Sequence, residues 1–137
     1  MLKKLISVFI VLLALNSVSF AESDVNFKSG KWEITSEMEM PGGMKMPSYT
    51  STQCMTKENI IPQNTQPGQE CVVTETKTTG NTITWTMECK GQQGDMKGVG
   101  KITYKGDTFK GEMVMSMPMA NMKIINKMKG RRIGECD

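Results

Sequence analysis

The sequence predicts an all-β domain, an antiparallel meander of about seven strands that curls into a closed or half-open barrel. Two observations predict it. Apolar and polar residues alternate with a period of two in several segments, and short turns containing glycine or proline separate these segments. No long amphipathic helix pattern lies between these segments, so we expect at most one short helix. We also expect disulfides to staple the meander.

The clearest alternation lies in the first predicted strand, Gly30 to Met40, which reads GKWEITSEMEM. Trp32 and Ile34 share one face with two methionines, while glutamates and a threonine share the other face. This pattern is typical of a strand with one buried face. The PGG sequence at 41–43 then supplies a turn into a second strand over 47–55.

A hairpin is predicted from Cys71 to Lys90, with its turn around Thr79-Gly80-Asn81. Its second half alternates well, with Ile83, Trp85 and Met87 on the same face as Cys89. The remaining strands are expected at 96–104, 108–117 and 121–129, where Lys105-Gly106-Asp107 forms a tight turn and Pro118 ends the sixth strand.

The first 21 residues have the pattern of a cleaved secretory signal peptide. Two lysines precede an apolar run from Leu5 to Leu15, and the small residues Ser19 and Ala21 mark a cleavage site. Cleavage leaves residues 22–29 as a short extension and 30–137 as a single β domain. The sequence therefore predicts a periplasmic, soluble and monomeric protein without a membrane anchor after cleavage.

The charge balance excludes some classes of partner. Seventeen basic residues face fourteen acidic ones, and two of the basic residues lie in the signal peptide. A mature domain so close to neutral has no electrostatic basis for binding nucleic acid or an anionic membrane surface.

Four cysteines in an oxidising compartment indicate two disulfides, and three pairings are possible. Cys71 and Cys89 lie on opposite strands of the predicted hairpin, so we expect them to pair. Cys54 would then pair with Cys136 and tie down the C-terminus. A zinc site is a poor alternative, because the chain has no C-x-x-C pair and no histidine.

Several short motifs also resemble one bacterial exported family. They are the Gly-Lys-Trp-Glu start of the first strand, TQCMT at 52–56, the Cys-to-Cys hairpin, G-D-x-F-x-G at 106–111 and the final G-x-C at 134–136. Together they resemble the domain of unknown function 3617 family, over Gly30 to Cys136. The resemblance implies a periplasmic β domain and implies no mechanism. The Gly-x-Trp start at 30–32 also resembles the first strand of lipocalins, which implies a lipocalin-like barrel.

Catalysis has little support in the sequence, so we expect no enzyme and no cofactor. Without histidine, the usual general base and the usual zinc ligand are both absent. Oxidised cysteines are not nucleophiles. The glutamates at 33, 37 and 39 fall on the polar face of a strand, where no cleft is indicated.

Apart from Met1, thirteen of the fourteen methionines remain in the mature chain, and they have four interpretations, which stay open at this point. They fill an irregular core, they line a cavity for a small apolar ligand, their thioethers bind a soft metal ion such as Cu(I) or Ag(I), or they scavenge oxidants by reversible sulfoxide formation. The predicted cavity lining is Trp32, Ile34, Met38, Met40, Ile83, Trp85, Met87, Phe109, Met113, Met115 and Met117. The predicted metal ligands are Met38, Met40, Met44, Met46, Met113, Met115, Met117 and Met119.

The sequence thus favours a non-catalytic accessory protein of the cell envelope, which binds a small apolar ligand or another envelope protein. The alternative is a methionine-rich protein of the envelope that binds Cu(I) or Ag(I).

Overall fold

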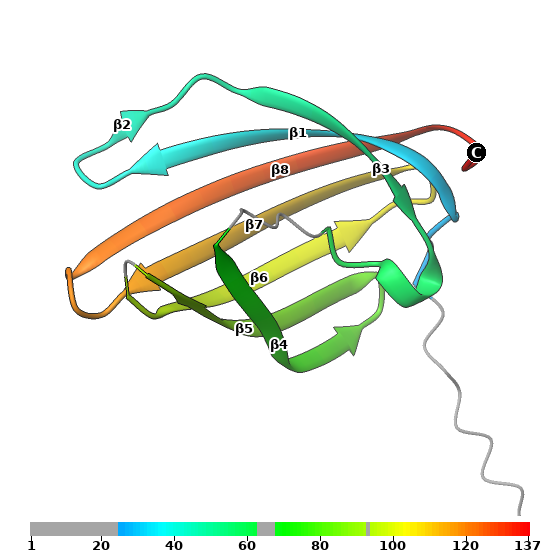
Figure 1. Ribbon diagram of the computed structural model, residues 1–137. Helices are drawn as coiled ribbons and strands as arrows, with labels where there is room; N and C mark the ends of the chain where they lie inside the picture. The colour runs from blue at the N-terminus through cyan, green and yellow to red at the C-terminus, as the bar shows by residue number, and fades with distance from the viewer. Residues whose placement is uncertain (1–24, 63–67, 93) are drawn as a thin grey trace, which may run out of the picture.

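The computed structural model describes residues 25–62, 68–92 and 94–137, which form an antiparallel β fold with one short 3-10 helix (Figure 1). The predicted signal peptide, residues 1–21, lies outside the described residues. The strands are β1 (Gly30–Met40), β2 (Met44–Lys45), β3 (Tyr49–Met55), β4 (Gln69–Thr79), β5 (Thr82–Gly91), β6 (Met96–Tyr104), β7 (Thr108–Met117) and β8 (Met122–Gly134), and the 3-10 helix is η1 (Lys57–Asn59).

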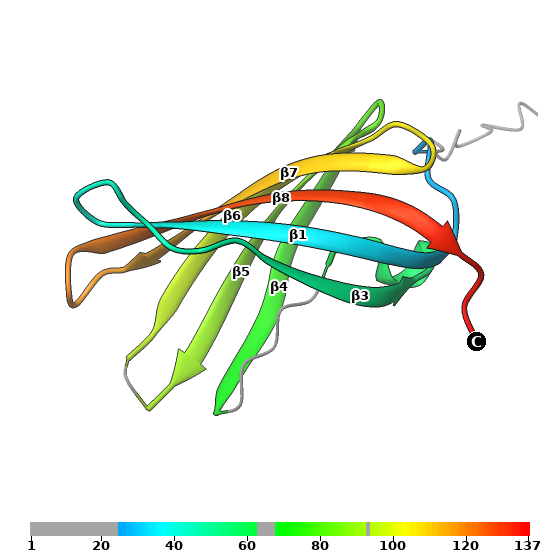
Figure 2. The ribbon, with the colours of Figure 1, turned by 90° about the horizontal axis from the view of Figure 1, so that it is seen from above.

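All strands belong to one antiparallel sheet in the order β2-β1-β8-β7-β6-β5-β4, and β3 also pairs with β1. β2 and β3 lie along the same edge of β1, β3 at its beginning and β2 at its end. The sheet twists so strongly that β1, β8 and β7 cross over β4 and β5 (Figure 2). Among the described strands no ladder joins β3 to β4, so the barrel is half open.

The predicted all-β fold is confirmed, with two differences in its elements. The two-residue β2 is an additional strand, formed where the turn after β1 folds back so that Met44 lies opposite Met40. The last strand does not end at Lys129 but continues to Gly134. It extends because β8 lies between β1 and β7 and pairs with both of them as far as Arg131.

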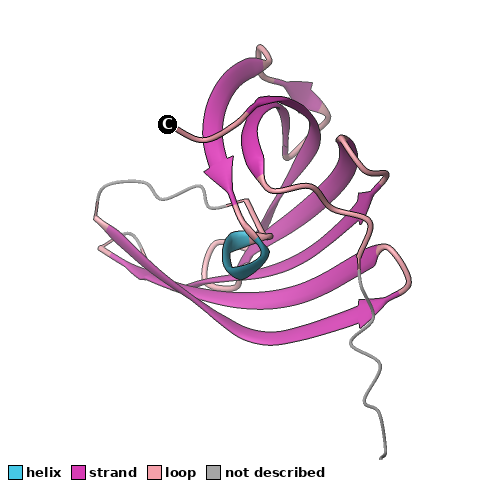
Figure 3. Cartoon of the chain, turned by 90° about the vertical axis from the view of Figure 1, so that its right-hand side faces the viewer, coloured by secondary structure: helices cyan, strands magenta, loops and turns pink. Residues whose placement is uncertain are grey.

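Four aromatic rings fill one end of the half-barrel. The Trp32 ring centroid lies 5.6 Å from that of Phe109 and 5.9 Å from that of Tyr104, and Phe27 stacks on Trp32 at 5.7 Å. All four side chains are buried. Seen from this end, η1 lies across the opening between the two curled halves of the sheet (Figure 3). This end is therefore a packed core rather than a cavity.

Tyr104 connects this core to the segment after η1. Its hydroxyl donates a hydrogen bond to the backbone carbonyl of Ile60. Burial raises the pKa of Tyr104 above its ordinary value, because the charged form is poorly solvated there. The side chain therefore stays a neutral hydrogen-bond donor.

Two glycines in the strands make room for rings that lie flat on the sheet. A Cβ on Gly100 of β6 would fall 2.7 Å from Cη2 of Trp85 and closer still to two other ring atoms. A Cβ on Gly130 of β8 would overlap the ring of Phe109 in the same way. Only glycine permits this close approach between a strand and a ring.

Two disulfides join strands of the half-barrel, and they are the pairs expected from the sequence. Cys71–Cys89 links β4 to β5, where the two residues lie directly opposite each other. Cys54–Cys136 joins β3 to the C-terminal segment, across 82 residues of chain. Among the described residues there is no free cysteine.

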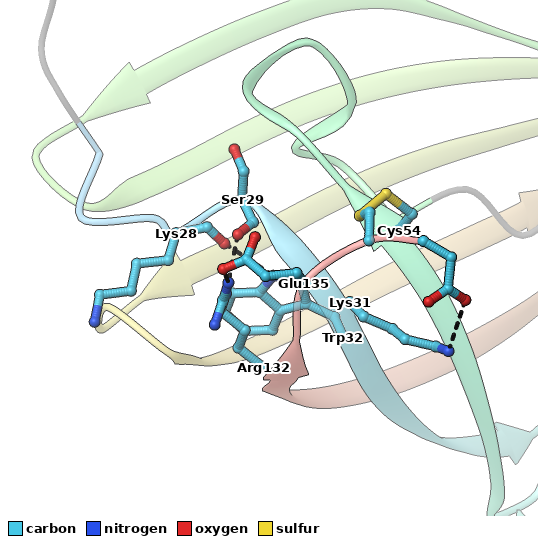
Figure 4. Close-up of a disulfide and its surroundings, with 9 residues drawn as sticks. Lys28, Ser29, Lys31, Trp32, Cys54, Arg132 and Glu135 are labelled. Atoms are coloured by element: carbon cyan, nitrogen blue, oxygen red, sulfur yellow. Dashed lines mark hydrogen bonds and ion pairs between the residues drawn. A yellow bond between two sulfur atoms is a disulfide. The ribbon is translucent and has the colours of Figure 1, made fainter.

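Polar contacts surround the Cys54–Cys136 bond and hold the chain ends together (Figure 4). Arg132 donates a hydrogen bond from Nε to the carbonyl of Ser29 at 2.9 Å, and it also forms an ion pair with Glu135. Trp32 donates from Nε1 to the carbonyl of Lys28 at 3.0 Å. The start of β1, the end of β3 and the end of β8 are thus fixed to one another.

Candidate functional site

The inner face of the half-barrel has a filled part and a more open part, and the residues predicted to line a cavity lie in both. In an antiparallel sheet, directly opposed residues point to the same side, so the ladder registers define this face. Buried members are Trp32, Ile34, Ile83, Trp85, Met87, Phe109 and Met113. Partly buried members are Met38, Met40, Met115 and Met117.

The open part is lined by methionine. Met117 lies opposite Met122, and Met115 lies opposite both Ile124 and Gly98. The partly buried inner-face methionines, which we call the methionine surface, are Met38 and Met40 on β1, Met96 on β6, Met115 and Met117 on β7, and Met122 on β8. It lies where the β1–β2 and β7–β8 turns diverge from β4 and β5 (Figure 2).

Gly98 lets two thioethers meet at the border of this surface. A Cβ on Gly98 would lie 2.6 Å from Sδ of Met115 and 3.3 Å from Sδ of Met87. The two sulfurs, from β7 and β5, therefore occupy the space that any other residue would fill with its side chain. Methionine suits such a place, because it is unbranched and adapts to irregular gaps.

One row of opposed residues crosses the inner face and contains two unusual polar groups. It runs from Met38 through Asn126, Met113 and Gly100 to Trp85. Oδ1 of Asn126 and Nε1 of Trp85 are both buried and have no hydrogen-bond partner within the described part of the chain. A buried acceptor and a buried donor without partners are uncommon, so this row needs an explanation.

The predicted metal ligands fall into two groups on either side of β8. Met38 and Met40 lie on β1, Met44 lies opposite Met40, and the Met46 amide donates to the Met38 carbonyl at 2.9 Å. The second group follows β7 and the turn after it. Its members are Met113, Met115, Met117 and Met119, which range from buried Met113 to Met119 with 92% of its surface exposed.

Several residues of the inner face were not predicted as site residues, namely Met96, Met122, Ile124 and Asn126. Met96 and Gly98 belong to a strand whose alternation is weakened by two glycines. The other three fall on one face of the predicted strand 121–129 by their spacing of two, so alternation alone contains the signal that would have found them.

The described residues offer no cluster of acidic side chains or cysteines that would extend this site. Within residues 25–62, 68–92 and 94–137, no group of three or more cysteine, aspartate or glutamate side chains is placed to hold a metal ion. The same residues contain no helix that is long and apolar enough to cross a membrane.

A sequence model of the family described as "Protein of unknown function (DUF3617)" matches residues 27–136. The chain belongs to this family. The match confirms the resemblance seen in the sequence motifs, and it includes all eight strands and the four cysteines of the two disulfides. No curated protein and no solved structure matches the chain.

Proposed function

We propose that this member of the DUF3617 family is an exported accessory protein of the cell envelope that binds a small, elongated apolar molecule on the methionine surface. The protein performs no catalysis of its own in this proposal. The two disulfides support an oxidising compartment such as the periplasm, together with the signal peptide pattern of the sequence.

One observation carries the proposal: six methionines stay only partly buried on the inner face of a half-barrel whose other end is packed with aromatic rings. Apolar side chains that pack a core are usually buried, as Met55 and Met128 are. An apolar, concave surface next to a rigid core is typical of sites for small apolar ligands. Methionine also adapts to the shape of such a ligand.

The polar atoms beneath this surface favour a ligand with a hydrogen-bonding end. Asn126 Oδ1 and Trp85 Nε1 flank Met113 in one row, and each lacks a partner among the described residues. A ligand hydroxyl group supplies both a donor and an acceptor. In this proposal, movement of the flexible Met113 side chain gives a ligand access to both atoms, so we expect fatty alcohols to bind better than alkanes.

The test is a fluorescence titration with N-phenyl-1-naphthylamine, an uncharged dye that brightens in apolar surroundings. We expect saturable binding to the mature protein and competition by decanol. The double variant Met40→Gln/Met117→Gln should weaken dye binding about tenfold, because two amides replace apolar groups on the surface. The control Met44→Gln/Met119→Gln changes the same number of methionines at exposed turns and should bind the dye normally.

Two results would contradict the proposal. The first is a dye that stays dark with the wild-type protein at saturating concentration. The second is an equal loss of binding in the test and control variants. Circular dichroism of each variant separates loss of binding from loss of fold.

A second candidate function, binding of Cu(I) or Ag(I), has a specific observation of its own. Met38, Met40, Met44 and Met46 lie on one two-stranded ribbon, where Met40 faces Met44 and Met46 bonds to the backbone of Met38. Cβ atoms of opposed residues are about 5 Å apart. Their flexible thioethers can therefore reach one soft cation, which prefers sulfur ligands.

Silver titration distinguishes this second candidate from the first. With methyl-labelled methionine, Ag(I) should shift the methyl signals of Met40 and Met44 together, and Met44→Leu/Met46→Leu should weaken binding at least about tenfold. Met119→Leu is the matched control. Shifts spread evenly over all exposed methionines would contradict a defined metal site.

A further inference from the structure

A groove of about 660 Å³ lies over β1, β8 and β7 on the outer face of the sheet, away from the methionine surface. Its charged side chains are four cations, Lys105, Lys110, Lys129 and Arg131, and one carboxylate, Glu33. The groove is therefore strongly cationic, although the chain as a whole is close to neutral. This inference is independent of the function proposed for the inner face.

The single carboxylate in the groove is already paired. Arg131 donates from Nε to Oε1 of Glu33 at 3.0 Å. Lys105, Lys110 and Lys129 form no ion pair with any carboxylate in the described part of the chain. Within the described residues, no ion pair neutralises these three positive charges.

The sheet register places two of these charges directly opposite each other. Lys110 on β7 faces Lys129 on β8, and like charges in that position are destabilising. The neighbouring row has the opposite arrangement, since Lys127 lies between Glu37 and Glu112. The sheet therefore balances its charges in one row and leaves them unbalanced in the next.

Hydroxyl groups complete the unbalanced row. Thr35 lies opposite Lys129, and Thr103 lies opposite Lys110, so the row reads Thr35, Lys129, Lys110, Thr103 across β1, β8, β7 and β6. Thr108, opposite Arg131, also lines the groove. Ammonium and hydroxyl groups are both donors to the oxygen atoms of an anion.

We propose that this groove binds a phosphorylated small molecule, with its phosphate between Lys110 and Lys129. A bound phosphate removes the repulsion between the two lysines and accepts hydrogen bonds from the flanking threonines. The groove is larger than a phosphate ion and has the size of an ordinary small-molecule site. The phosphate belongs either to a free metabolite or to the headgroup of a lipid.

The first test uses inorganic phosphate as the probe and backbone amide NMR shifts as the readout, at constant ionic strength set with chloride. Phosphate should shift the amides around Lys110 and Lys129 in a saturable way. Lys110→Gln and Lys129→Gln should each weaken binding about fivefold, because each removes one full charge beside the anion. Lys127→Gln, on the same strand between two carboxylates, should change it less than twofold.

The free protein offers a second readout that does not depend on affinity. At low salt, Lys110→Gln should raise the midpoint of thermal unfolding because it removes the like-charge contact, whereas Lys127→Gln should not raise it. Phosphate should raise the midpoint of the wild type more than that of Lys110→Gln. Equal effects of phosphate on wild type, Lys110→Gln and Lys127→Gln would overturn the proposal.

Vesicles distinguish the two sources of the phosphate. Cosedimentation with vesicles of phosphatidylcholine and phosphatidylglycerol, but not with pure phosphatidylcholine, supports a lipid headgroup if Lys110→Gln/Lys129→Gln abolishes it. Specific phosphate binding without cosedimentation supports a free phosphorylated molecule. If neither phosphate nor these vesicles bind, the proposal is wrong.

Discussion

Replacing both Cys54 and Cys136 by alanine is expected to lower the free energy of unfolding by about 4 kcal/mol, more than any other change to the crosslinks. The bond spans 82 residues, so it restricts the unfolded chain more than Cys71–Cys89, which spans 18 and should contribute about 3 kcal/mol. Urea unfolding of the oxidised double variants measures both values.

The comparison between the two disulfides is the informative part of this experiment. The native contacts around Cys136 should add little to this difference, although Lys31 also pairs with Asp137 at 3.5 Å and Arg132 with Glu135. These pairs are exposed, so their own contributions are small. A smaller loss for Cys54→Ala/Cys136→Ala than for Cys71→Ala/Cys89→Ala would show that the C-terminal segment does not close the fold as described.

Substituting alanine for Gly100 should destabilise the protein by about 3 kcal/mol or more. The new methyl group would overlap the Trp85 ring, which is 2% exposed and surrounded by other core residues. Neither side can give way easily, because β6 is hydrogen-bonded to β5 and to β7. Thermal unfolding followed by circular dichroism measures the loss.

Gly134→Ala is the matched control for Gly100→Ala. Nothing lies within 4 Å of a Cβ at Gly134, and its backbone does not require a positive φ. This variant should change the free energy of unfolding by less than about 0.5 kcal/mol. Equal stability of the two variants would mean that the Trp85 ring does not lie on β6.

Much of this fold follows from alternation along single strands. The period of two in Gly30 to Met40 assigned Trp32 and Ile34 to the buried face, and the structure places both in the core. Spacing within the Cys71–Lys90 hairpin also identified one disulfide, and a register shift between Val73 and Glu75 completes the opposition of Cys71 and Cys89. Such features depend on local geometry, which the sequence encodes directly.

Features that depend on distant strands were harder to predict. β8 pairs with β1, which lies about a hundred residues earlier in the chain, so its true length was not visible in the spacing of its own residues. The packing of Phe109 on Gly130 likewise joins two strands. A lone glycine in a strand does not indicate which ring covers it.

The candidate site also combines features that single strands predict with features that depend on how strands pair. Alternation placed Met38, Met40, Met115 and Met117 on apolar faces, but it does not distinguish the buried from the partly buried end of such a face. The opposition of Lys110 and Lys129 depends on the four-residue turn between Met117 and Met122. The predicted last strand begins one residue too early, at Asn121. Its register therefore does not place these two lysines opposite each other.

The central claim is that the inner face is packed at its aromatic end and open at its methionine end. The most direct measurement is the methyl NMR spectrum of labelled methionine in the presence of an uncharged nitroxide, which broadens the signals of accessible methyl groups. The account predicts broad signals for Met38, Met115, Met117 and Met122 and sharp ones for Met55 and Met128. Signals of Met115 and Met117 that stay as sharp as that of Met55 would contradict it.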